Sequence, residues 1–214
     1  MESYAVIGLG RFGYSIAQEL MAAGCEVLAI DQDEELVQRM ADSVTDAVVA
    51  DARDEAVLRN LGIRNYDCGV VSIGSDVAAS ILITLLLKEA GVAKVVCKAS
   101  DEIHKKALLK VGADRVVIPE KEMAGRVARG LANPNVMDYI ELSGQFAIVE
   151  RSAPEGWIGK SLKDLNVRNK YGVSIIAFRR DREMIVSPRP DEPIAEGDVL
   201  IVLGREDDLA RLKK

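Results

Sequence analysis

The sequence has little of several residue types that mark a particular chemistry. Its 214 residues include one histidine, three cysteines, one tryptophan and 4% aromatic residues. Cys25, Cys68 and Cys97 are far apart and adjoin apolar runs, whereas a metal or redox site needs a paired spacing such as C-x-x-C, so we expect small core residues. The longest nearly continuous apolar stretch, residues 77–87, is far shorter than the roughly 20 residues of a membrane-spanning helix.

Charge excludes a further class of protein. The formal net charge is −6, the pI is about 5.0, and no basic face is concentrated anywhere, so a nucleic-acid partner is not expected. The first residues lead directly into a strand-like segment, without the basic and apolar regions of a secretory signal, which predicts a cytoplasmic protein. With 49% hydrophobic residues, the chain can form a packed core.

The first part of the chain alternates short β-rich runs with longer helical patterns, as in βαβ units. The expected strands are 4–7, 26–30, 46–50, 68–73, 94–98 and 114–118, and the expected helices are 11–23, 34–41, 54–60, 77–90, 101–111 and 121–132. The strands are almost uninterrupted apolar runs, as expected where helices cover both faces. This pattern predicts an α/β fold with a Rossmann-like, doubly wound parallel sheet.

The pattern changes after Asn133-Pro134-Asn135. Strands are expected at 138–143, 146–151, 173–179, 183–187 and 198–203, separated by turn-rich segments and short helices. We therefore predict a nucleotide-binding domain over residues 1–133 and a smaller α+β domain over 134–214, with the helix at 121–132 and the Pro134 region as their connection.

A glycine motif, G-x-G-x-x-G, occupies residues 8–13 between a strand and a helix. Gly8 permits a tight turn, Gly10 lets the backbone approach a phosphate, and Gly13 allows close helix–strand packing. Asp31 ends the second strand, 18 residues after Gly13, where a carboxylate binds ribose hydroxyls and disfavours the 2′-phosphate of NADP. The combination predicts a nucleotide site; the alternative is that the glycines serve only the turn.

Arg11 lies inside this motif, next to Phe12, at the start of the helix. A guanidinium there lies beside the phosphates and can bind their oxygens with two hydrogen bonds, which favours a ligand such as ATP. The alternative is a surface arginine that happens to begin a helix.

Other candidates follow the remaining strands, at the edge where this fold places its ligand. They are Asp51, Ala52, Ile73, Gly74, Ser75, Lys98, Ala99 and Ser100. Asp76 is an equally good N-cap of the following helix, and Lys98 a solvated strand end. Glu120, after the sixth strand, could bind a divalent cation or a partner subunit, or simply be a first-turn helix residue.

Catalytic machinery is missing from the sequence. It has no nucleophile elbow, P-loop lysine motif or metal-ligand cluster, and His104 is expected on the surface of a helix. The second domain is small for a substrate pocket. We therefore predict that the protein is not an enzyme.

A resemblance follows the chain in order along nearly its whole length, and it is carried by residues 5–13, 61–65, 82–90, 110–115 with 119–121, and 164–168 with 170–172. They resemble the RCK or KTN family (TrkA-N plus TrkA-C) of cytosolic regulators of potassium conductance, most closely the regulatory subunits of bacterial Ktr-type potassium uptake systems.

The resemblance implies a homo-octameric ring of dimers at the inner face of the cell membrane, bound to a membrane-embedded potassium transporter subunit. ATP and ADP would favour different ring shapes, with Arg11 near the γ-phosphate and Glu120 beside it with a divalent cation, Mg²⁺ or Ca²⁺. Besides the glycines, Phe12 and the strand-end candidates above, it implies cofactor-binding roles for Asp31, Gln32, Asp33 and His104. Lys98 differs from more distant relatives, which carry arginine there.

The second domain resembles the family's C-terminal domain, which in related subunits binds cyclic di-AMP. Arg168, Ile175, Ile176 and Pro188 are the candidates; the alternative is that the isoleucines are core and Arg168 is a surface residue. Arg179, Arg180 and Arg182 are expected to form a solvated charge cluster on a hairpin turn.

Two other functions remain open at this point. One is an NAD(H)-dependent oxidoreductase or NAD(H) redox sensor, supported by the same glycine motif and Asp31. The other is a structural oligomerisation protein with a vestigial nucleotide pocket.

Overall fold

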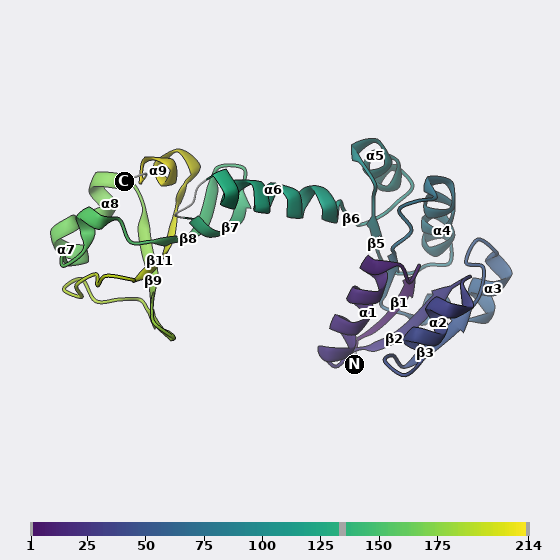
Figure 1. Cartoon of the computed structure of the whole chain (residues 1–214). Helices are drawn as coiled ribbons and strands as arrows, with labels where there is room; N and C mark the ends of the chain where they lie inside the picture. The colour runs from purple at the N-terminus through teal and green to yellow at the C-terminus, as the bar shows by residue number, and fades with distance from the viewer. Residues whose placement is uncertain (1, 133–135, 213–214) are drawn as a thin grey trace. The chain divides into compact units, whose positions relative to one another are not determined.

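The computed structural model describes residues 2–132 and 136–212, which form two compact units, Met1–Pro119 and Glu120–Lys214 (Figure 1). The expected linker Asn133-Pro134-Asn135 lies outside the described residues. The helix that precedes this linker is α6 (Pro119–Ala132). From Glu120 onward it groups with the second unit by its contacts. The domain boundary after residue 133 stays a prediction.

The first unit is a six-stranded parallel sheet in the order β3-β2-β1-β4-β5-β6, the strand order of a Rossmann fold. Its strands are β1 (Ser3–Ile7), β2 (Glu26–Asp31), β3 (Asp46–Val49), β4 (Cys68–Val71), β5 (Lys94–Lys98) and β6 (Arg115–Val117). Its helices are α1 (Arg11–Ala22), α2 (Glu34–Ala41), α3 (Glu55–Asn60), α4 (Val77–Glu89) and α5 (Glu102–Lys110), with a short 3-10 helix η1 (Ile63–Asn65). The predicted doubly wound sheet is confirmed.

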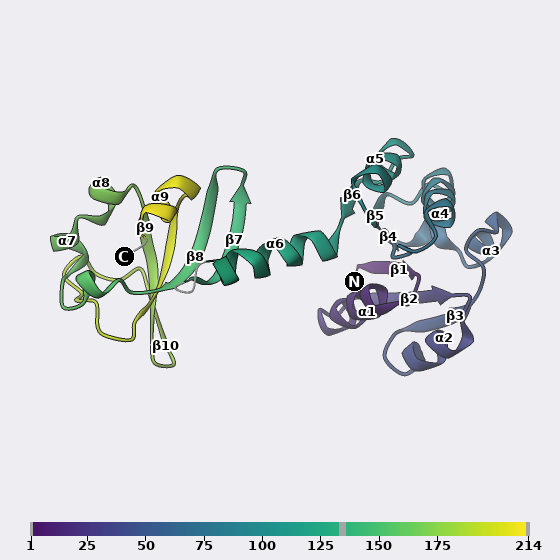
Figure 2. The same cartoon turned by 45° about the horizontal axis from the view of Figure 1, so that its top comes forward.

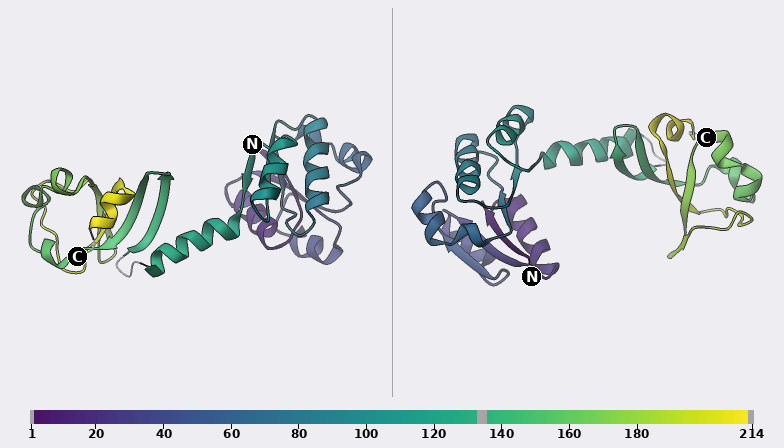
Figure 3. Two further views of the ribbon diagram at one scale, coloured as in Figure 1. Left: turned by 90° about the horizontal axis from the view of Figure 1, so that it is seen from above. Right: turned by 180° about the vertical axis from the view of Figure 1, so that it is seen from behind.

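Helices cover both faces of this sheet (Figures 2 and 3). Side chains alternate along β1, so Ala5 and Ile7 pack in one core with α3, α4 and α5, while Val6 packs in a second core with α1 and α2. Cys68 and Cys97 are buried in these cores, as expected, and Cys25 is half-buried. Burial on both faces explains why the strands read as continuous apolar runs.

An aspartate is the N-cap of four of the five α-helices described in the first unit. The side chains of Asp33, Asp54, Asp76 and Asp101 accept hydrogen bonds from first-turn amides of α2, α3, α4 and α5. The alternative role of Asp76 as an N-cap is thus confirmed. Helix α1 differs, because its N-cap is Gly10, which has no side chain to accept those bonds.

The second unit contains a five-stranded antiparallel sheet in the order β10-β9-β11-β8-β7, which confirms the α+β prediction. Its strands are β7 (Val136–Ser143), β8 (Phe146–Ser152), β9 (Ser174–Arg180), β10 (Glu183–Val186) and β11 (Val199–Arg205). Besides α6 it has α7 (Leu162–Leu165), α8 (Val167–Tyr171), α9 (Glu206–Arg211) and a 3-10 helix η2 (Glu155–Trp157). Trp157, Phe178 and Leu200 are among the buried residues of its core.

The expected solvated arginine cluster is wrong for two of its three members. Arg179 and Arg180 end strand β9, and Arg179 pairs with Glu150. Arg180 makes two hydrogen bonds of 2.8 Å to the carboxylate of Asp198, whose side chain is fully buried. A buried carboxylate such as that of Asp198 is strongly destabilising without a charged partner, so Arg180 pairs with it instead of extending into solvent.

No helix in the described residues is long and apolar enough to cross a membrane.

Candidate functional site

The glycine turn connects the end of β1 to α1, and packing requires glycine at two of its positions. Gly8 has φ +91°, and its N–H donates to the carbonyl oxygen of Ile30 at 2.9 Å. A Cβ atom at Gly13 would lie 1.9 Å from the carbonyl oxygen of Gly8 and 2.9 Å from Oγ of Ser72. The turn and the first helical residues are therefore in direct backbone contact.

Gly10 has a different environment. A Cβ atom there would have no other atom within 4 Å, and the backbone conformation, φ −61° and ψ −177°, suits other residues as well. The first turn of α1 contains no acidic residue. The N-terminus of α1 therefore has no side-chain cap and presents its first-turn amides and a favourable helix dipole, with open space around the Cβ position of Gly10. Helix N-termini of this kind bind phosphate.

Asp31 ties the end of β2 to the glycine turn. Its Oδ2 accepts from the N–H of Leu9 at 2.6 Å, and its Oδ1 accepts from the N–H of Asp33 at 3.0 Å. Each carboxylate oxygen can accept a second hydrogen bond. The side chain is half-buried and held in one orientation, with capacity left for ribose hydroxyls.

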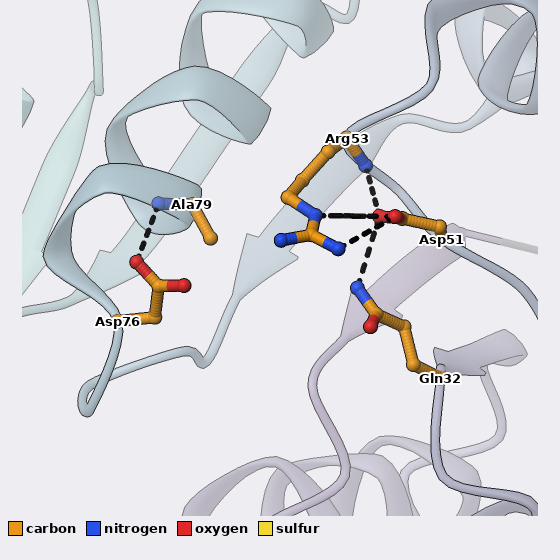
Figure 4. Close-up of polar contacts among 5 residues, drawn as sticks. All are labelled: Gln32, Asp51, Arg53, Asp76 and Ala79. Atoms are coloured by element: carbon orange, nitrogen blue, oxygen red, sulfur yellow. Dashed lines mark hydrogen bonds and ion pairs between the residues drawn. The ribbon is translucent and has the colours of Figure 1, made fainter.

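A polar cluster lies at the ends of β2 and β3 (Figure 4). Arg53 binds the carboxylate of Asp51 through Nε at 2.9 Å and through a terminal nitrogen at 2.7 Å, and Gln32 Nε2 donates to Asp51 at 2.9 Å. The hydrogen bonds from Arg53 lower the pKa of Asp51 to about 2. Asp51, and more weakly Asp76, raise the pKa of Arg53. Sequence reasoning missed Arg53, although its position two residues after Asp51 was a signal.

The ends of β4 and β5 bring three further candidates together. The ammonium of Lys98 lies 5.9 Å from the centre of the Phe12 ring, and Cε of Lys98 would lie 3.4 Å from a Cβ atom at Gly74. Lys98 is half-buried rather than a fully solvated strand end. Ser75 and Ser100 are exposed, Ile73 is half-buried, and Ala52 and Ala99 are buried.

The expected surface position of His104 is wrong. Its side chain is 2% exposed, because it lies on the face of α5 that also carries the buried Leu108, one turn later. Nδ1 accepts from the N–H of Ser100 at 3.2 Å, and burial lowers the pKa of the imidazole. His104 therefore supports the backbone after β5, while its expected contact with the cofactor stays a prediction.

Arg11 and Glu120 lie in different units. The guanidinium of Arg11 is exposed at the start of α1 and has no hydrogen-bond or ion-pair partner in the described part of the chain. Glu120 is in the first turn of α6, in the second unit. Residues 2–132 and 136–212 contain no group of three or more His, Cys, Asp or Glu side chains that could hold a metal ion.

A groove of about 450 Å³ opens in the second unit beside α7, α8 and β9. Arg168, Ile175 and Pro188 all line it, but Ile176 does not. Strand β9 therefore presents only one of the two isoleucines to the groove.

Comparison with known proteins gives matches to both halves of the chain. The TrkA-N domain matches residues 4–119 and the TrkA-C domain matches residues 146–214. Among similar proteins of Bacillus subtilis (strain 168), the Ktr system potassium uptake protein C is 47% identical over 213 residues and the Ktr system potassium uptake protein A is 45% identical over 212 residues. These alignments cover 100% and 99% of this chain and 96% of each relative.

One solved structure, the GsuK channel bound to NAD, is 25% identical with a TM-score of 0.54. The similarity covers 99% of this chain and 38% of that one.

Proposed function

Because the chain belongs to the TrkA-N/TrkA-C family, which includes the Ktr system potassium uptake proteins, we propose that it is a regulatory subunit that senses adenine nucleotides and regulates a membrane potassium transporter. The protein binds ATP and ADP at the carboxyl edge of the first sheet and carries out no reaction on them.

The observation that supports this proposal best is the open N-terminus of α1. Four neighbouring helices use an aspartate as the N-cap, whereas the N-cap of α1 is Gly10, and no atom lies within 4 Å of a Cβ added there. Asp31 is fixed nearby by the amide of Leu9. An anion-binding helix end next to a ribose-binding carboxylate suits a nucleotide.

Arg11 supplies the difference between ATP and ADP. Its exposed guanidinium extends from the first residue of α1, so it is free to bind a phosphate beyond the diphosphate. A ligand shifts a conformational equilibrium only through unequal interactions with the two states, and the γ-phosphate provides such an interaction.

Calorimetric titration with ATP and ADP tests this proposal. We expect Arg11→Ala to weaken ATP binding roughly tenfold or more and ADP binding less than about twofold, because one charge-assisted contact is lost only with ATP. Arg39→Ala, at an exposed arginine of α2, is the control and should change neither affinity. Equal losses for ATP and ADP would contradict γ-phosphate sensing.

An NAD(H) sensor is the second candidate, because the similar GsuK channel was solved bound to NAD and Asp31 suits an unphosphorylated ribose. Titration with NADH separates the two. Tighter binding of NADH than of ATP, with no effect of Arg11→Ala, would favour the redox function.

The proposal includes an assembly and a location. The chain forms a homo-octameric ring of dimers, bound from the cytoplasm to its transporter subunit, and Glu120 takes part in holding a divalent cation with the nucleotide. Light scattering measures the molar mass of the assembly and so tests for eight copies of the chain. A monomer or simple dimer with nucleotide bound would contradict it.

The second unit is proposed to bind cyclic di-AMP in the groove that Arg168, Ile175 and Pro188 line. The exposed arginine can bind phosphate, and the apolar residues can contact the bases.

A further inference from the structure

The polar cluster of Gln32, Asp51 and Arg53 leaves the carboxylate of Asp51 almost fully occupied. Its Oδ1 accepts from Gln32 Nε2, from Arg53 Nε and from the backbone N–H of Arg53, each at 2.9 Å. Its Oδ2 accepts from Arg53 at 3.1 and 2.7 Å. A carboxylate has about four acceptor positions, so Asp51 has little capacity left for a ligand. Its main interaction is with Arg53.

Arg53 itself is held in place but not covered. The two-point contact with Asp51 fixes the plane of the guanidinium, and the side chain remains 43% exposed. Figure 4 shows the guanidinium on the side of Asp51 that faces the start of α4, where Asp76 binds the N–H of Ala79. A planar cation therefore lies between the loops that follow β3 and β4.

This position fits the base of a nucleotide. In this fold the phosphates bind at the first helix and the ribose binds at the end of the second strand, here α1 and Asp31. The base then extends away from the phosphates, toward the loops after β2, β3 and β4. Gln32, Arg53 and Asp76 come from those three loops. A guanidinium plane can stack on an aromatic ring, with both hydrogen-bonding edges still occupied.

We propose that Arg53 is the platform on which the adenine base stacks, and that Asp51 is a positioning residue that holds this platform. This inference rests on the proposed nucleotide-binding function. It assigns the affinity for the base to a cation from the β3–α3 loop, and gives the Asp51 side chain an indirect role.

The test compares ATP with ribose 5-triphosphate, which lacks only the base, by calorimetric titration of the full chain. Arg53→Ala should weaken ATP binding roughly five- to tenfold, as expected for the loss of one cation–π contact, and leave ribose 5-triphosphate within about twofold. Arg59→Ala is the matched control, because Arg59 is also exposed and paired, 2.7 Å from Glu55 on α3. It should change neither affinity.

A double-mutant cycle tests the role of Asp51. Asp51→Asn should weaken ATP binding in the same direction as Arg53→Ala but by less, because the amide holds the guanidinium less firmly. The double variant should bind ATP no more weakly than Arg53→Ala alone, since Asp51 acts through Arg53. Additive losses would overturn this role and show that Asp51 contacts the nucleotide itself.

The failures can be told apart. If the unmodified chain binds neither ATP nor ribose 5-triphosphate, the proposed function fails and this inference fails with it. If ATP binds, but Arg53→Ala leaves its affinity unchanged, raises it, or lowers both affinities equally, only the platform is wrong. Unchanged melting temperatures of the variants exclude a loss of folded protein as the cause.

Discussion

The candidate binding surface of the first unit is formed mainly by backbone, whereas that of the second unit is formed by side chains. In the first unit, backbone geometry at Gly8, Gly10 and Gly13 makes the surface. In the second, side chains such as Arg168 and Ile175 line a groove beside an antiparallel sheet. A site formed by backbone constrains the residue type at fixed spacing, so its motif can be recognised in the sequence. A site formed by side chains depends on elements that folding brings together.

The largest effect should come from Gly13→Ala. The added Cβ atom would meet the carbonyl oxygen of Gly8 at 1.9 Å, and both groups belong to packed backbone, so we expect a loss of about 3 kcal/mol or more in the stability of the first unit. Far-UV circular dichroism should show an earlier transition. Fluorescence of Trp157, the chain's one tryptophan, reports the second unit and should change little.

Gly10→Ala is the control for this substitution, since nothing lies within 4 Å of the new atom. Its melting temperature should fall by only a few degrees, far less than for Gly13→Ala, because Ala is a poorer N-cap than Gly but meets no packed atom here. ATP binding should nevertheless weaken. Equal destabilisation by both variants would show that the packing role is not specific to Gly13.

In the second unit, stability should depend on a side-chain pair. Asp198→Asn removes the charge that two hydrogen bonds from Arg180 and one from the N–H of Ala195 hold in a buried position. We expect a loss of about 2 kcal/mol, less than for a fully buried pair because Arg180 is one-third exposed. Urea unfolding followed by Trp157 fluorescence measures it, and Glu192→Gln, at a longer contact of 3.3 Å, should cost less.

The same pair predicts a pH dependence. The hydrogen bonds from Arg180 hold the pKa of Asp198 below its usual value. The stabilisation is therefore fully present above the unfolded pKa, about 4, and is lost as the pH falls through the lower pKa of the folded state. The stability difference between the unmodified chain and Asp198→Asn should shrink from pH 7 to pH 3. A constant difference would show that Asp198 acts through packing.

The smallest effect should come from Arg168→Ala. This arginine is exposed at the groove, so its removal should leave the Trp157 transition unchanged while weakening cyclic di-AMP binding roughly tenfold, through the loss of a phosphate contact. Ile176→Ala, outside the groove, is the control for Ile175→Ala. Only the Ile175 variant should bind more weakly. No measurable binding to the unmodified chain would exclude the ligand.

Sequence alone predicted most of the fold, because hydrophobic periodicity and turn residues are local signals. The six parallel strands and the five antiparallel strands appear within a few residues of their expected bounds. It also indicated the glycine turn and Asp31, whose spacing along the chain reflects one compact βαβ unit.

Only the tertiary structure decided which side chains meet. It buried His104, paired Arg180 with Asp198, joined Arg53 and Gln32 to Asp51, and separated Ile175 from Ile176. Burial and pairing depend on what lies opposite a residue in space, and residues from different loops carry no shared period along the chain. The sequence therefore determined where backbone bends and packs closely, and folding determined which charges and rings face one another.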